Sequence, residues 1–340
     1  MLLEFKEKLM SDPLKSETHS NNFRRLGETE IHLSPIGLGT WQFSSGVGNL
    51  GKFWDPLKSD TMTGIVKTAL NSGVNWFDTA ESYGDGASER NLSTSLKSLD
   101  VTPGNVIIAD KWWPKQRKAS SIIETIEERL KCLQGYPIDL YQIHWPESES
   151  WLRTEMKMLA QLVDEGKVKA VGLCNYNRRD LKRAHRQLRK RGIPLASIQM
   201  RYSLAHRDID RNNIMNVAKD LGVSVIAWSP LEQGLLTGRL HDNPESINNL
   251  NKHRVEMFGF SPQRLKQTKE LINVLKKVAE RHHATPAQIS VAWLTQFHGE
   301  SVFAIPGASS IEQAESNCAS MLIKLTTDEL GEIDEVSKSL

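Results

Sequence analysis

Short apolar stretches alternate with amphipathic helical patterns along most of this chain, and that alternation limits the folds it can adopt. Seven of these stretches have the length and composition of buried strands: 74–77, 106–109, 138–143, 168–173, 195–200, 223–228 and 302–305. Helical patterns separate most of them, for example 60–72, 119–133, 152–165, 178–191 and 210–221. Pro35 to Thr40 predicts one further strand at the start of the series. Successive strand ends lie roughly 25 to 40 residues apart until the last, as expected for βα units.

Glycine marks the joints between the predicted helices and strands. Four positions follow a helical pattern and precede an apolar strand: Gly73, Gly166, Gly192 and Gly222. Glycine adopts the left-handed conformation that ends a helix without a steric penalty. Helix starts are marked as well, because Thr285 to Gln288 and Ser309 to Glu312 both fit capping boxes. These signals predict a regular series of helix-to-strand returns.

Polar residues stand at the ends of successive predicted strands: Thr40, Asp78, Lys111, His144, Asn175 and Gln199. A charge at the end of a buried strand is costly unless it is paired, so Asp78 and Lys111 can serve as each other's partner. A closed (β/α)8 TIM barrel, an α/β fold, collects these ends at one mouth, whereas the alternative, an open doubly wound sheet, spreads them along an edge. Gly46 to Gly51 matches G-x-G-x-x-G, but no helix pattern follows it. We therefore interpret that segment as a flexible loop and favour the barrel.

The strand-end residues and a tyrosine that follows one of them resemble the catalytic tetrad of the aldo-keto reductase family, in order and in context: Asp78, Tyr83, Lys111 and His144. The resemblance implies that residues 23–340 form a (β/α)8 barrel. It also implies an N-terminal β-hairpin at Phe23 to Ser34 and a long cofactor-covering loop after strand 7, at Leu235 to Pro262. Residues 1–22 precede the region of resemblance, and we expect a flexible extension there.

The tetrad suits the reduction of a carbonyl group. A tyrosine with its ordinary pKa of about 10 is a poor acid at neutral pH. A nearby ammonium such as that of Lys111 stabilises the phenolate and lowers that pKa, and Asp78 would hold the ammonium in place. His144 can hydrogen-bond the carbonyl oxygen and orient it. In the family's mechanism the cofactor's hydride goes to the carbonyl carbon while tyrosine, here Tyr83, protonates the oxygen, and no metal is required.

The resemblance also implies a cofactor site, for NADPH in preference to NADH. The implied cofactor-binding residues are Gly39, Thr40, Trp41, Asp78, Asn175, Gln199, Trp228, Ser229, Pro230, Leu231, Gly234, Arg239, Gly307, Ser309, Gln313 and Asn317. Two positions depart from the family pattern. Cys174 replaces the serine of a G-x-S-N motif, and Ser316 replaces a glutamate found in some relatives. The preference for NADPH follows from the Ser309-Ser310 pair, which resembles NADP-binding members.

Aromatic residues gather just beyond the predicted strand ends. We expect the substrate pocket to be formed by Trp41, Trp54, Tyr83, Trp112, Trp113, His144 and Trp145. So many indoles predict an apolar or aromatic pocket with few fixed charges, although some of them could pack loops instead. The substrate is a small-molecule carbonyl compound, and small aldehydes, ketones and sugar-derived carbonyls all remain open.

Composition narrows the classes of partner. A net charge of +2 over 340 residues gives no reason to expect a nucleic acid or a membrane as partner. Eight basic residues between Arg178 and Arg191 fit a solvated barrel helix. Three cysteines without paired spacing indicate reduced thiols and a cytoplasmic protein. No apolar run reaches membrane-spanning length. The oligomeric state stays open.

Two other functions compete with NADPH-dependent reduction of aldehydes or ketones. Some members of the family bind NADP(H) and serve mainly as accessory subunits of ion channels, with weak or no turnover. A metal-dependent barrel hydrolase or isomerase would need several carboxylate or histidine ligands, and Asp78 and His144 alone are too few. The intact tetrad favours the reductase.

Overall fold

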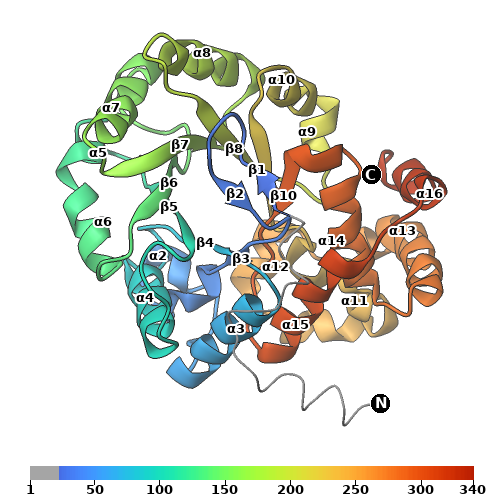
Figure 1. Ribbon diagram of the computed structural model, residues 1–340. Coiled ribbons are helices and arrows are strands. Elements are labelled where there is room, and N and C mark those ends of the chain that lie inside the picture. Colours follow the sequence, from blue (N-terminus) through green and yellow to red (C-terminus); the bar gives the residue numbers. More distant parts are fainter. Residues whose placement is uncertain (1–22) are drawn as a thin grey trace.

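Eight parallel strands follow one another around a ring in the computed structural model, which describes residues 23–340 (Figure 1). The strands are β3 (Leu38–Gly39), β4 (Trp76–Asp78), β5 (Ile107–Trp112), β6 (Ile138–Ile143), β7 (Val168–Cys174), β8 (Leu195–Arg201), β9 (Ser224–Trp228) and β10 (Val302–Ala304). The ring closes beside β3, where Ala304 N–H donates to Pro35 O at 3.0 Å and Gly37 N–H donates to Ala304 O at 2.9 Å. The predicted barrel is confirmed, and the open sheet is wrong.

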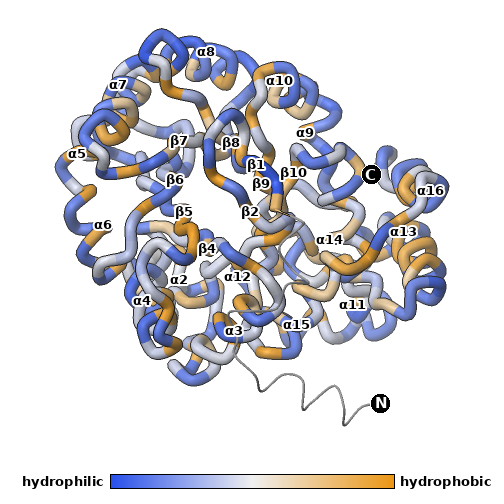
Figure 2. Tube along the Cα trace, in the orientation of Figure 1, coloured by the Kyte–Doolittle hydropathy of each residue, from blue (hydrophilic) through white to orange (hydrophobic). Residues whose placement is uncertain are grey.

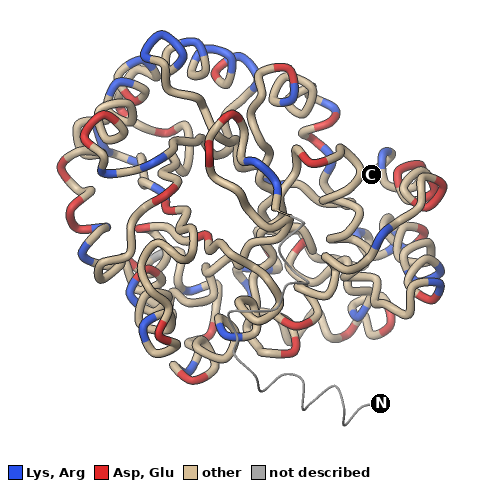
Figure 3. Tube along the Cα trace, viewed as in Figure 1, with Lys and Arg blue, Asp and Glu red and all other residues tan. Residues whose placement is uncertain are grey.

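Helices surround the strand ring on the outside. The principal ones are α3 (Ser59–Asn71), α4 (Ala87–Ser98), α5 (Ser121–Glu124), α6 (Ile126–Cys132), α7 (Leu152–Asp164), α8 (Arg178–Arg189), α9 (Asp208–Arg211), α10 (Ile214–Asp220), α13 (Pro262–Arg281), α14 (Pro286–Gln296), α15 (Ile311–Ala319) and α16 (Thr327–Ser337). Apolar residues recur along one side of several helices (Figure 2). In α8, Leu181, Ala184 and Leu188 are buried, while basic residues cover its exposed side (Figure 3). Within residues 23–340, no helix combines the length and the apolar character needed to cross a membrane.

Two predicted helices are interrupted. The pattern at 119–133 forms α5 and α6, which meet at Thr125. The pattern at 210–221 overlaps α9 and forms α10, and between them Asn213 takes a left-handed conformation with φ of 64°. An L-residue in that conformation cannot continue a right-handed helix. Hydrophobic spacing carries no signal for such a single-residue break.

A small hairpin closes the N-terminal end of the barrel, as predicted. Its strands β1 (Arg24–Arg25) and β2 (His32–Leu33) pair in antiparallel register and lie across the ring in Figure 1. Gly27 N–H donates to the Ser224 hydroxyl at the start of β9, at 2.7 Å. The buried side chains Leu26 and Leu33 join a cluster with Trp76 from inside the barrel. Side chains of the hairpin therefore fill the interior at the N-terminal end of the barrel. The end formed by the C-terminal ends of the strands is left for a functional site.

The predicted loop after β9 is built from short helical turns. These are η2 (Glu232–Thr237), α11 (Arg239–Asp242), η3 (Pro244–Asn249) and α12 (Lys252–Phe258). Each is too short to leave a readable hydrophobic period. The segment reaches the loop after β3, because Asn251 Nδ2 donates to Lys52 O at 3.0 Å and the Arg254 guanidinium lies 4.4 Å from the Trp54 ring centre.

Two local features differ from the sequence interpretation. Residues 48–51 of the G-x-G-x-x-G match form a single turn, α2 (Gly48–Gly51), which follows the 3₁₀ turn η1 (Trp41–Ser44). The second capping box is shifted by one residue, since Ser310 is the N-cap of α15 and its hydroxyl accepts from Gln313 N–H. The Gln313 side chain accepts in turn from Ser309 N–H at 2.9 Å. The capping box at Thr285 is present as predicted.

The barrel interior leaves no room for a side chain at Gly37. A Cβ atom built there would lie 2.3 Å from the Trp76 indole. We expect Gly37→Ala to destabilise the protein by about 1–3 kcal/mol, because overpacking forces the indole or the backbone to move. Gly331→Ala is the matched control, since the same methyl group meets nothing within 4 Å inside α16 and favours the helix. Urea denaturation measures both, and wild-type stability in Gly37→Ala would contradict this account.

Candidate active site

A buried ion pair forms the floor of the site, at the ends of β4 and β5. Lys111 Nζ donates to Asp78 Oδ1 at 2.5 Å and to Thr79 O at 2.7 Å. The second oxygen of Asp78 accepts from Gln199 Nε2 at 2.8 Å. Asp78 and Lys111 are both almost completely buried. The strands thus bring together the two charges that the sequence marked as possible partners.

Each member of the pair keeps its charge because of the other. Burial raises the pKa of Asp78, while the Lys111 ammonium and hydrogen bonds from Gln199 and Gln142 oppose that rise. Burial alone would lower the pKa of Lys111, but the charge of the Asp78 carboxylate and its hydrogen bond to the ammonium outweigh burial and hold that pKa above its ordinary value. Breaking such a pair would leave one uncompensated charge in the interior.

Tyr83 places its hydroxyl beside the ammonium. Its oxygen lies 3.4 Å from Lys111 Nζ, and its ring centre lies 4.8 Å from the same atom. Burial raises the pKa of Tyr83 to about 12, and the Lys111 charge offsets only part of that rise. The lowering by lysine that the sequence suggested is present, but burial outweighs it. Tyr83 is therefore a phenol that holds its proton at neutral pH.

His144 approaches the phenol from the end of β6. Its ring meets the Tyr83 ring edge to face, with centroids 5.5 Å apart, and meets Trp113 in the same way at 5.3 Å. His144 Nδ1 lies 3.2 Å from the Ser82 hydroxyl. Burial and the neighbouring Lys111 charge lower the pKa of His144 well below its ordinary value. A neutral imidazole that accepts from Ser82 through Nδ1 has a proton on Nε2 to donate.

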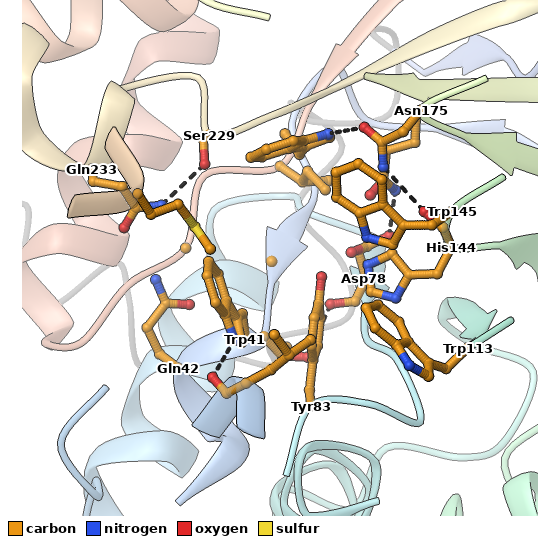
Figure 4. Close-up of a pocket in the computed structure, with 18 residues that line it drawn as sticks. Trp41, Gln42, Asp78, Tyr83, Trp113, His144, Trp145, Asn175, Ser229 and Gln233 are labelled. Carbon is orange, nitrogen blue, oxygen red and sulfur yellow. Dashed lines mark hydrogen bonds between the residues drawn. The ribbon is translucent and has the colours of Figure 1, made fainter. Parts of the chain in front are cut away.

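Asp78, Tyr83 and His144 border a cavity of about 260 Å³ at the barrel mouth, and Lys111 lies behind them outside its lining (Figure 4). Its lining consists of Gly39, Thr40, Trp41, Gln42, Leu50, Asp78, Tyr83, Trp113, His144, Trp145, Asn175, Gln199, Trp228, Ser229, Gln233, Met257, Ile305 and Gly307. The indole of Trp41 stacks on the Tyr83 ring with centroids 6.0 Å apart. Asp78 is the one ionised side chain that the described residues contribute to this lining, and it is paired with Lys111.

Asn175 ties three strand ends together. Its Nδ2 donates to His144 O at 3.0 Å, and its Oδ1 accepts from Trp228 Nε1 at 3.0 Å. It has a φ of 64°, in the left-handed region where asparagine is better tolerated than most residues. The preceding Cys174 is buried, and burial raises the pKa of its thiol. The Asn175 amide therefore shapes the mouth as well as facing the cavity.

Two residues expected in the substrate pocket do not line this cavity. Trp112 is fully buried in the core, where its indole N–H donates to the Ser121 hydroxyl at 3.1 Å. Side chains alternate along a strand, so Trp112 faces the helices because its neighbour Lys111 faces the interior. Trp54 packs edge-on against Trp41, with centroids 5.8 Å apart, and supports that wall from outside.

Several residues implied for cofactor binding also lie outside the cavity. They occupy the segments that follow β9 and β10: Pro230, Leu231, Gly234, Arg239, Ser309, Gln313 and Asn317. Arg239 is exposed at the start of α11, and Asn317 is buried, with its Nδ2 donating to Gly307 O at 3.2 Å. These seven residues therefore belong to two segments that do not line the cavity at those positions.

Five lining residues were not singled out from the sequence: Gln42, Leu50, Gln233, Met257 and Ile305. Gln42 Oε1 and Gln233 Oε1 are buried without a hydrogen-bond partner among residues 23–340. Such acceptors fit a ligand that brings donors of its own. The position of Gln42, directly after Trp41 at the end of a strand, was the available signal for that residue.

The family profile described as "Aldo/keto reductase family" matches residues 35–338. The chain belongs to the aldo/keto reductase family. A probable aldo-keto reductase 1 of Glycine max is 30% identical over 321 residues, covering 90% of each chain. An uncharacterized oxidoreductase of Mycobacterium bovis is 36% identical over 309 residues, again covering 90% of each.

Solved structures agree with the sequence relatives. A thermostable aldo-keto reductase in complex with the inhibitor epalrestat superposes with a TM-score of 0.73 at 28% identity, covering 92% of this chain and 99% of that one. Aldo/keto reductases are oxidoreductases that act on small carbonyl compounds and generally use nicotinamide cofactors. The buried pair, the phenol and the imidazole described above lie where the strand ends of this aldo/keto reductase meet.

Removing the cation tests the buried pair. We expect Lys111→Met to destabilise the protein by about 3–5 kcal/mol at pH 7, because Asp78 is left as an unpaired buried carboxylate. Without the ammonium the folded-state pKa of Asp78 rises further, so the folded variant binds a proton that the unfolded chain has released. The loss of stability of Lys111→Met relative to the wild type therefore becomes smaller as pH falls from 7 to 5.

Urea denaturation of Lys111→Met at pH 7 and pH 5 measures this effect. The double variant Lys111→Met with Asp78→Asn is the control, since it buries no net charge and should recover part of the lost stability at pH 7. Equal stability of the single and double variants at both pH values would show that the pair carries no such coupling.

Proposed function

We propose that this protein reduces aldehydes or ketones to alcohols with NADPH, and that Tyr83 donates the proton. The observation that carries the proposal is a protonated phenol 3.4 Å from a buried ammonium, at a cavity that it shares with a neutral imidazole. Tyr83 and His144 can then both donate hydrogen bonds to one carbonyl oxygen. Bound NADPH would supply the hydride for the carbonyl carbon.

The remaining tetrad residues prepare Tyr83 for proton donation. As the proton leaves the phenol, negative charge develops on its oxygen, and the Lys111 ammonium stabilises that charge at short range. Asp78 holds the ammonium in position and balances its positive charge between turnovers. The indoles of Trp41 and Trp113 limit access of water to the phenol, which strengthens these interactions.

The residues present fit a nicotinamide cofactor. Trp228 offers an aromatic face to the cavity, beside the Asn175 and Gln199 amides. The unpartnered acceptors Gln42 Oε1 and Gln233 Oε1 provide further hydrogen-bonding capacity. The ring-bearing end of the cofactor would be held here, and its phosphates by the segments after β9 and β10 that contain Arg239 and Ser309 to Asn317.

The preference for NADPH over NADH is also part of the proposal. Arg239 supplies an exposed cation within the segment that follows β9. Ser309 and Ser310 stand at the start of α15, where helix geometry favours anions.

A relative in Arabidopsis thaliana, 28% identical over 325 residues, is named as a chloroplastic pyridoxal reductase, and its substrate name denotes an aldehyde.

We place this protein in the cytoplasm on the grounds of its three buried, unpaired cysteines.

Replacing the phenol tests the proposed reaction. We expect Tyr83→Phe to slow NADPH oxidation with a reactive aromatic aldehyde by about 10²–10⁴-fold, since the variant lacks the proton donor. NADPH binding, followed by tryptophan quenching, should persist. Tyr136→Phe is the matched control, because its hydroxyl donates to Val101 O away from the cavity. Wild-type rates in Tyr83→Phe would overturn the role of Tyr83.

The same assay separates the reductase from an accessory subunit. Binding of NADPH by the wild type without turnover of aromatic, aliphatic or sugar-derived aldehydes would favour the accessory role.

Because the pKa of His144 is held well below its ordinary value and that of Tyr83 is about 12, we expect neither group to change protonation between pH 7 and 9. The rate of the chemical step should therefore stay nearly constant over that range.

A further inference from the structure

A second group of ionisable side chains lies on the outer side of β5, facing away from the cavity. We call it the carboxylate cluster, and its members are Glu81, Glu89, Asp110, Arg117 and Arg129. Asp110 directly precedes Lys111, so the two side chains point to opposite sides of the strand. Glu89 and Asp110 are fully buried. Burying so many charged groups needs a reason, since unpaired charges are costly in the interior.

Glu81 connects this cluster to the loop that carries Tyr83. Its backbone N–H donates to Lys111 O at 3.2 Å. Its side-chain Oε1 accepts from the backbone N–H of Trp113 and, at 2.5 Å, from Arg117 Nη1. Glu81 therefore binds the end of β5 on both sides of Trp112, and Tyr83 follows two residues later in the chain.

The contact between Tyr83 and Lys111 is sensitive to the position of that loop. At 3.4 Å it is already long for a hydrogen bond, so a shift of a few tenths of an ångström would break it. The loop cannot adjust freely at its tip, because Gly84 has a φ of 73° and a Cβ there would lie 2.3 Å from Ser44 O. The backbone of Glu81 closes the other end of the same turn, where Gly86 N–H donates to Glu81 O at 2.9 Å, and the Glu81 side chain ties this residue to the end of β5.

The cluster contains one carboxylate more than it has guanidinium groups. Arg129 Nη1 donates to Glu89 Oε2 at 2.7 Å. The remaining oxygens, Glu89 Oε1 and Asp110 Oδ2, are buried without a partner among residues 23–340. Three carboxylates of the cluster face its two guanidinium groups. Arg90 nearby is exposed and donates to Cys132 Sγ and Asp85 O, and Arg129 also pairs with the exposed Glu128. A proton shared by Glu89 and Asp110 would satisfy both orphan oxygens and neutralise the excess charge.

The surroundings of the pair favour that proton. Burial and the nearby Asp110 carboxylate raise the pKa of Glu89 well above its ordinary value. Burial also raises the pKa of Asp110, to about 6. The charged and titratable groups that face the pair are Arg90, Glu81, Lys111, Arg129, Cys132 and Tyr141.

We propose that Glu81 is a positioning residue for Tyr83, and that it is supported by a carboxyl pair, Glu89 and Asp110, that shares one proton. This proposal rests on the proposed function, in which Tyr83 is the proton donor. Glu81 itself stands outside the cavity lining and acts through the loop.

Kinetics of Glu81 variants test the positioning role. We expect Glu81→Ala to lower kcat by at least about tenfold while the KM for NADPH changes less than twofold, because the cofactor contacts stay in place and only the phenol moves. Glu81→Gln should restore most of kcat, since an amide oxygen can accept from Trp113 N–H and Arg117. Glu127→Gln is the control: Glu127 pairs on the surface with Lys167, which is not a member of the cluster.

Hydrogen exchange provides a readout that does not depend on turnover. Backbone amides of residues 79–88 should exchange faster in Glu81→Ala than in the wild type or in Glu127→Gln. If the wild type fails to reduce aldehydes, the proposed function fails, and exchange still decides the positioning role. Unchanged exchange and unchanged kcat in Glu81→Ala would overturn it. So would an equal loss of kcat in Glu81→Gln and Glu81→Ala.

Melting of Glu89→Gln tests the shared proton. Glutamine mimics protonated glutamate, because its amide can donate to Asp110 while its oxygen accepts from Arg129. In the wild type, the folded protein keeps a proton that the unfolded chain loses above the ordinary pKa of about 4.3, so stability falls as pH rises. The difference in Tm, Glu89→Gln minus wild type, should therefore become more positive as pH rises from 5 to 9.

The exposed Glu127→Gln serves as control here too, and its Tm should run parallel to that of the wild type across the range. Parallel curves for Glu89→Gln, or an equal deficit at every pH, would show that both carboxyl groups are ionised. That result would remove the shared proton from the proposal.

Discussion

The buried pair of Asp78 and Lys111 is the interaction on which the rest of the site depends. Two opposite charges are stable at the barrel mouth only because their partners come from different strands: Gln199 from β8 and the carbonyl of Thr79 after β4. A barrel of parallel strands supplies such partners, since it brings all strand ends to one place. The phenol and the imidazole are then arranged around a fixed ammonium.

Alternation along β5 lets one strand carry two different environments. Lys111 points into the barrel, and its neighbours Asp110 and Trp112 point outward, one into the carboxylate cluster and the other into the apolar core. The same rule explains why Trp112 does not line the cavity, although it stands next to a residue that belongs to the tetrad. Glu81 bridges the two sides, because it follows β4 and reaches the end of β5 from outside.

The sequence predicts the parts of this structure that repeat or that end a strand. Apolar stretches with polar ends identified the strands, the order of the barrel and the residues that meet at its mouth. It does not predict features set by single contacts in space. Hydrophobic spacing carries no signal for the left-handed Asn213 that separates α9 from α10, nor for the pocket position of Gln233 within a run of short turns. The one-residue shift of the cap to Ser310 depends on which serine the chain brings into line with the helix.

The balance of charge around Tyr83 explains how one site can both hold and release a proton. Burial favours the neutral phenol, and the ammonium of Lys111 favours the phenolate, so the two effects oppose each other at the same oxygen. With burial stronger, the proton stays on Tyr83 until a better acceptor arrives, and the ammonium then stabilises the charge left behind. Since Asp78 already neutralises Lys111, the site as a whole gains little from an anionic ligand beside the phenol. Recognition there depends on hydrogen bonds to one polar oxygen and on contact with the indoles.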